Sequence, residues 1–110
     1  ALPAPDVEAF VAKHGDKIRR LVGNESPETR LAAVRALGKT RDLDEVPVLI
    51  YALTDPDSQV VRAAHNALLR ISRNPTAVHL PEQFTEENRR LAIEKWKTWY
   101  RVIRPNANLK

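Results

Sequence analysis

Apolar residues along the chain recur at intervals of three and four, which is the spacing of one face of an α-helix. Clusters of β-branched residues bounded by turns, which would indicate strands, do not occur. Together with helix-starting residues and prolines, the pattern predicts an all-α fold. The five helices are expected near residues 6–23, 27–38, 44–53, 56–72 and 86–103.

The expected helix boundaries rest on residues that favour helix ends. The predicted N-caps are, in chain order, Asp6, Ser26, Asp44, Asp55 and Thr85. Proline directly follows two of these caps, at the first helical position, where its missing N–H costs no helical hydrogen bond. Gly15 is expected to break the first helix, and Gly38 is expected to end the second.

Each of the later helices carries an apolar face that predicts the core. The inward positions expected for 44–53 and 56–72 are Val46, Leu49, Ile50, Leu53, Val60, Ala64, Ala67, Leu68 and Ile71. In the last helix a broad buried face is predicted, made of Leu91, Ala92, Trp96, Trp99, Tyr100, Val102 and Ile103. Residues 73–84 hold two prolines and are predicted to be an irregular crossing, pinned by Val78, Leu80 and Phe84.

The sequence also repeats itself at an offset of 31 residues. This offset aligns Ala32 with Ala63, Ala33 with Ala64, Ala36 with Ala67, Leu37 with Leu68, Ile18 with Leu49 and Val22 with Leu53. A unit of this length that contains two helices is typical of a helical solenoid.

Within this repeat, the segment Thr54–Leu68 resembles the turn and first helix of short HEAT repeats of the bilin-lyase-like class, and Ser26–Gly38 is similar to the same unit. With the second helix, Val46–Leu53, the resemblance covers about residues 16–72. It implies one domain over residues 1–110, folded as a right-handed α-solenoid of about two helical hairpins plus a terminal helix. It also implies a bacterial source and a role in protein binding or as a scaffold.

The chain departs from the family pattern at two kinds of position. Val61 stands where the pattern often has arginine and Asn24 where it often has aspartate, so the ladder of stacked Asp/Arg pairs of longer HEAT repeats is not predicted. The final segment, Arg90–Trp99, lies outside the repeat and resembles terminal helices attached to HEAT arrays in bacterial proteins. Trp96 and Trp99 are expected to cap the open end of the stack; the alternative is an exposed pair that stacks on bases or sugars.

The composition narrows the class of protein. A chain of 110 residues with 43 % hydrophobic and 29 % charged residues is expected to fold as one globular domain, as a monomer or part of a longer array. The absence of cysteine excludes disulfides, cysteine-ligated metals and thiol nucleophiles. The longest apolar run, Val46–Leu53, falls short of the roughly 18 residues of a membrane span, and the compartment, cytoplasmic or exported, stays open.

The net charge of +4 belongs to the C-terminal segment, because acidic and basic residues balance over residues 1–84. On a helical wheel Arg90, Lys97, Arg101 and Arg104 share a narrow arc opposite the tryptophans, and such a stripe would follow a phosphate backbone. Nucleic-acid binding is therefore the alternative function. Against it stand the neighbouring Glu86 and Glu94 and the favourable effect of cations near a helix C-terminus.

Catalytic and metal-binding patterns are not found, and we predict no enzyme activity, metal or cofactor. His14, His65 and His79 lack metal-site spacing and are expected at the surface or half-buried. Asp42, Asp44 and Glu45 are read as helix-start acids in preference to a cation site. The enzyme rivals on related repeats, a lyase or a DNA-repair glycosylase, would need a clustered nucleophile or paired carboxylates that the chain does not show.

A binding surface for a partner protein is predicted on the second helix of each unit. With the apolar face of 44–53 turned inward, Val48 and Tyr51 point outward, and the 31-residue offset maps them to Lys17 and Arg20. HEAT-like stacks commonly bind through such a ridge, and Tyr and Arg are frequent interface anchors. The alternative is an ordinary solvated face with one exposed tyrosine.

Overall fold

The computed structural model describes the backbone of residues 6–74 and 78–109 and the side chains of residues 13–74 and 78–109. These residues form helices only, with no strand among them, which confirms the predicted all-α fold. The elements are α1 (Asp6–Leu21), α2 (Pro27–Lys39), the 3₁₀ turn η1 (Leu43–Glu45), α3 (Val46–Ala52), α4 (Ser58–Ser72) and α5 (Glu86–Ile103).

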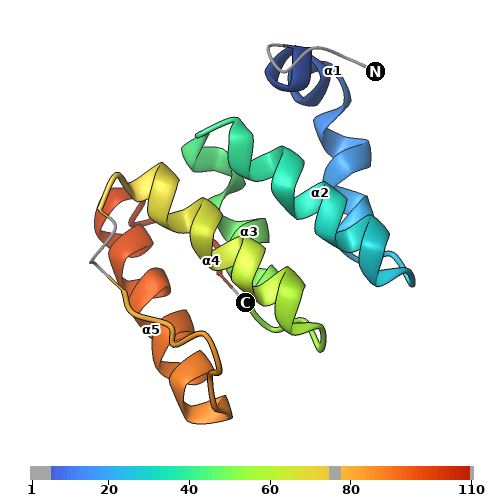
Figure 1. Ribbon diagram of the computed structural model, residues 1–110. Helices are drawn as coiled ribbons and strands as arrows, with labels where there is room; N and C mark the ends of the chain where they lie inside the picture. Colours follow the sequence, from blue (N-terminus) through green and yellow to red (C-terminus); the bar gives the residue numbers. More distant parts are fainter. Residues whose placement is uncertain (1–5, 75–77, 110) are drawn as a thin grey trace.

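The helices stack as repeated hairpins (Figure 1). α2 and α4 lie side by side across the front, α1 packs on α2, and α3 packs behind α4. α5 lies on the other side of α4 from α2. The predicted inward positions of residues 44–53 and 56–72 are all buried, which confirms the core predicted from the apolar faces of these helices. The handedness of the stack stays a prediction.

Gly38 lies at a close approach within the core, where α2 crosses α4. A Cβ atom at this position would lie 2.6 Å from the Cβ of Ala67, so α2 and α4 come nearer than any side chain at position 38 permits. The prediction that Gly38 ends the helix is therefore wrong, because α2 continues to Lys39 and the glycine serves the helix crossing.

Two of the predicted N-caps are also wrong. Asp57 and not Asp55 caps α4, by accepting a hydrogen bond from the Gln59 N–H (2.8 Å). Asp42 caps η1 through the Asp44 N–H (2.9 Å), and α3 then begins at Val46 without a side-chain cap. The carboxylates of Asp44 and Asp55, which cap no helix, bind arginines from other parts of the chain instead.

The other predicted helix ends agree more closely with the structure. Ser26 caps α2, and Thr85 caps α5 in a reciprocal pair with Asn88. α1 has non-helical backbone angles at His14, directly before the predicted break at Gly15. The side chain of Asp6, the predicted cap of α1, lies outside the described residues.

α5 buries a narrower face than the sequence predicts. Ala92, Trp96 and Tyr100 are buried, and Trp99 is half-buried against the core. The other predicted face residues, Leu91, Val102 and Ile103, are exposed. α5 has neighbouring helices on one side only. Its apolar face covers about half of the helix, which is wider than the strip that these neighbours can bury.

The crossing between α4 and α5 is anchored as predicted. Val78 and Leu80 are buried, and Phe84 packs against the core. Arg62 of α4 holds the backbone here, since it donates to the carbonyl oxygens of Leu80 (2.8 Å) and Pro81.

Hydrogen bonds at both ends of α5 set its direction against α3. Near its start, Arg89 Nη1 donates to the carbonyl oxygen of Leu53, just after α3. Near its end, the Tyr100 hydroxyl donates to the carbonyl oxygen of Leu43 (2.9 Å), just before α3. α5 therefore runs antiparallel to α3.

Candidate functional site

The predicted partner ridge comprises Lys17, Arg20, Val48 and Tyr51, and the structure places two of these residues on α1 and two on α3. Lys17 and Arg20 are exposed and both line a hollow of about 350 Å³ beside the bend of α1. Between them on α1, Arg19 binds the buried Glu45 with its Nε (3.0 Å) and Nη2 (2.8 Å), which ties α1 to the start of α3. The hollow does not extend to Val48 or Tyr51.

The two α3 residues differ in exposure. Tyr51 is 61 % exposed, whereas Val48 is half-buried and packs against the core. A large aromatic ring left in water on a helix whose opposite face is fully packed is the type of side chain that anchors protein interfaces. Tyr51 is therefore the stronger of the two candidates.

The basic arc on α5 is partly neutralised by acidic partners. Arg90 binds Glu87 on the same helix (2.6 Å), and Arg104 binds Asp44 before α3 (2.8 Å). Hydrogen bonding to Arg90 lowers the pKa of Glu87, so this carboxylate stays charged. Of the remaining two residues Lys97 is half-buried and Arg101 is exposed.

One rung of an Asp/Arg ladder is present, although the sequence did not predict it. Arg30 of α2 donates from Nε to Asp55 Oδ2 (2.8 Å) and from Nη2 to Oδ1 (3.2 Å), in a bidentate pair that is largely buried. The same guanidinium also donates to the carbonyl oxygens of Asn24 (2.8 Å) and Glu25 (3.0 Å). One arginine thus joins the turn before its own helix to the turn of the next unit.

The next rung is made by a residue from outside the repeat. Val61, which aligns with Arg30, is fully buried and donates no side-chain hydrogen bond. Arg89 of α5 supplies the arginine here, because its Nη1 donates to the carbonyl oxygen of Asp55 (2.7 Å). This carbonyl is the repeat equivalent of the Asn24 carbonyl that Arg30 binds. Its guanidinium also lies over the Phe84 ring, 5.4 Å from the ring centre.

Comparison with protein families agrees with this architecture. A family model for HEAT repeats matches residues 16–94, from within α1 into α5. The chain belongs to the HEAT-repeat family. No curated protein and no solved structure matched it. HEAT repeats generally mediate protein–protein interaction or scaffolding, and the family is generally non-catalytic.

The histidines of this HEAT-repeat chain include one buried side chain, contrary to expectation. His65 is 2 % exposed, and its Nδ1 accepts a hydrogen bond from the indole Nε1 of the fully buried Trp96 (3.2 Å). Burial lowers the pKa of His65 to about 4, assisted by the charges of Arg62 and His79. The repeat held a signal for this burial, because position 65 aligns with the fully buried Val34.

Clustered chemistry is not found elsewhere in the described part of the chain. Over residues 13–74 and 78–109, no three histidine or acidic side chains converge in the manner of a metal site. The predicted acidic group is divided, since Asp42 caps η1, Asp44 binds Arg104 and Glu45 binds Arg19. None of the described helices has the length and apolar character needed to cross a membrane.

Proposed function

We propose that this chain is a non-catalytic HEAT-repeat module that binds another protein through the outward face of α1 and α3. The exposed ring of Tyr51 is the observation that carries the proposal, because every other residue of α3 is buried or half-buried. Lys17 and Arg20 add cationic side chains on α1. Tyrosine and arginine are among the residues enriched in protein interfaces.

Nucleic-acid binding through α5 has less support. Phosphate binding needs cations that are free to replace counterions, and two of the four residues of the arc already bind carboxylates. Tyr51 and the ridge lie on different helices from this arc, so the two functions can be tested independently.

The test is quantitative affinity capture from the source organism, followed by mass spectrometry. A variant with Tyr51→Ala, Lys17→Glu and Arg20→Glu leaves the core untouched and is expected to lose the partners that the unaltered chain recovers. Val102→Ala is the matched control, because Val102 is an apolar side chain that is 78 % exposed on α5. Equal recovery of the same partners by the triple variant would refute this ridge as the binding site.

A further inference from the structure

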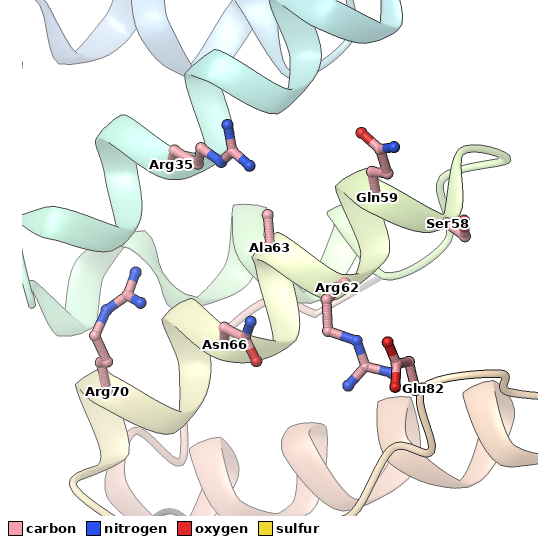
Figure 2. Close-up of a pocket in the computed structure, with 8 residues that line it drawn as sticks. All are labelled: Arg35, Ser58, Gln59, Arg62, Ala63, Asn66, Arg70 and Glu82. Atoms are coloured by element: carbon pink, nitrogen blue, oxygen red, sulfur yellow. The ribbon is translucent and has the colours of Figure 1, made fainter.

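A second hollow lies along α4, between α2 and the crossing at residues 78–84 (Figure 2). It has a volume of about 390 Å³ and is lined mainly by polar side chains from α2, α4 and the crossing at residues 78–84. We call it the arginine hollow, after Arg35, Arg62 and Arg70. Arg35 reaches it from α2, Arg62 and Arg70 from α4, and Glu82 stands on its rim beside Arg62.

The charges in the arginine hollow do not balance. Three guanidinium groups line it against one carboxylate, Glu82. Among the described residues, none of the three arginines forms a salt bridge. Five arginines elsewhere do so, namely Arg19, Arg30, Arg89, Arg90 and Arg104. The hollow therefore concentrates positive charge in a segment, residues 26–84, whose total charge is zero.

The fold holds one of these arginines in place and leaves room for another. Arg62 donates to the backbone carbonyls of Leu80 and Pro81, which fixes its guanidinium without neutralising it. Arg70 lies over the α2–α4 crossing, with Nη2 only 3.0 Å from where a Cβ of residue 38 would be. Because Gly38 has no side chain, Arg70 has room at the α2–α4 crossing, near Arg35 of α2.

We propose that the arginine hollow binds carboxylate side chains on an acidic segment of a partner protein. The guanidinium fork matches a carboxylate in a bidentate manner, and the lower dielectric constant in a hollow strengthens the attraction between the two charges. Gln59 and Asn66 in the same lining can bind the main chain of the segment. This proposal rests on the protein-binding function proposed above but concerns a separate surface.

A peptide suits the arginine hollow better than a nucleic acid. A phosphate backbone carries a regular row of charges and is bound by an extended track of cations. Here the arginines are gathered around one hollow, and Glu82 places a negative charge on its rim.

The binding test uses a short fluorescein-labelled peptide of alternating Glu and Ser, with a Gln and Ser peptide as its control, in fluorescence anisotropy titrations. We expect the acidic peptide to bind and the Arg35→Gln/Arg70→Gln variant to lose about tenfold in affinity. Lys95→Gln/Arg101→Gln removes the same charge from exposed positions on α5 and should change affinity less than about twofold. Equal losses in both variants, or no binding of the acidic peptide, would overturn the proposal.

A second variant tests the same site by filling it with a carboxylate of the chain itself, which should stabilise the fold and block the peptide. Asn66 is exposed and lies four residues from both Arg62 and Arg70, so Asn66→Glu places a carboxylate between them. We expect a raised melting temperature together with loss of peptide binding, whereas Asn66→Gln should bind as the unaltered chain does. A folded Asn66→Glu variant that still binds the peptide would show that the hollow is not the site.

Two further arms separate this proposal from its rivals. The first arm titrates a mixed-sequence DNA duplex. If the duplex binds more tightly than the peptide, and Arg35→Gln/Arg70→Gln abolishes that binding, the hollow is a phosphate site and the proposal is overturned. The ridge variant with Tyr51→Ala should keep full peptide binding. If the peptide fails to bind while the ridge variant still loses its captured partners, the hollow is refuted and the proposed function stands.

Discussion

Single residues in this chain often take roles that their neighbours in space decide. Asp44 and Asp55 stand in sequence contexts that favour helix caps, yet each binds an arginine from a distant segment, and Asp42 and Asp57 cap the helices instead. When two aspartates stand near the start of one helix, the local sequence pattern does not distinguish which of them caps it. The arginine that binds one of the two lies far away in the sequence, so local patterns could not predict which aspartate is the cap.

The buried His65 makes folding sensitive to acid. Its pKa of about 4 in the folded chain lies below the ordinary value of 6.5, so between these values the unfolded chain binds more protons. The free energy of unfolding therefore falls as the pH is lowered from 6.5 to 4, by about 3 kcal/mol in total from this group. Above pH 6.5 the effect is absent.

His65→Gln should flatten this pH dependence, because a glutamine oxygen can still accept from the Trp96 indole but does not titrate. Urea unfolding at several pH values measures the slope in each variant, so any constant cost of the substitution cancels. His79→Gln, at an exposed position, is the comparison and should keep most of the slope, because the charge of His79 is the smallest of the three causes that lower the pKa of His65. If the slopes of the unaltered chain and His65→Gln agree, His65 does not carry the acid sensitivity.

At the scale of helices, period and repeat together predicted which elements form and which faces of α3 and α4 are inward. This succeeded because those helices are covered by neighbours of their own kind. It failed for the width of the buried face of α5, which lies at the end of the stack. It also misread Gly38, since a glycine late in a helix has the same local appearance whether it ends the helix or lets another helix approach.

Gly38→Ala should destabilise the α2–α4 crossing despite the better helix propensity of alanine. The gain in propensity is about 1 kcal/mol, but the added Cβ would overlap Ala67 and force the helices apart, and we expect a net loss of about 2 kcal/mol. Chemical denaturation measures this change.

Two further variants make the explanation specific. Gly38→Ala/Ala67→Gly moves the methyl group to the other helix and should recover much of the loss. Gly23→Ala adds a methyl group at an exposed position with ordinary contacts and should be tolerated. A double variant no more stable than Gly38→Ala alone would count against a steric origin.

At the scale of the molecule, α5 closes the stack through contacts that the sequence pattern did not predict. Arg89 binds the turn after α3, Trp96 binds His65 of α4, and Tyr100 binds the backbone before α3. The arginine hollow has a similar origin, since its lining comes from three segments that only the assembled stack brings together. The ridge needed less information, because Val48 and Tyr51 follow from the periodicity of one helix and Lys17 and Arg20 from the 31-residue offset; that the ridge binds a partner stays a prediction.

Arg89→Leu should loosen α5 from the stack. The change leaves the Leu53 and Asp55 carbonyls without this donor, and we expect a loss of about 2 kcal/mol in the free energy of unfolding. Both tryptophans lie on α5, so their fluorescence reports its docking, while far-ultraviolet circular dichroism reports all helices. In this variant the fluorescence transition should come at lower urea than the dichroism transition.

Arg90→Leu is the control for this experiment, because Arg90 is exposed and pairs only within its own helix. Its two transitions should coincide with those of the unaltered chain. A single coincident transition in Arg89→Leu, at an unchanged midpoint, would show that Arg89 does not lock α5.

The exchange of Arg30 for Val61 at equivalent positions also distinguishes an internal unit from the unit that meets α5. The internal unit needs an arginine to bind the aspartate of the following turn, whereas the last unit has a buried valine and receives its arginine from α5. An engineer who lengthens the array by copying residues 42–72 would therefore have to restore arginine at the position of Val61 in the first copy and keep valine in the second. The duplicated unit would again present His65 and the Asp55 turn to α5, so the terminal helix could be reused without redesign.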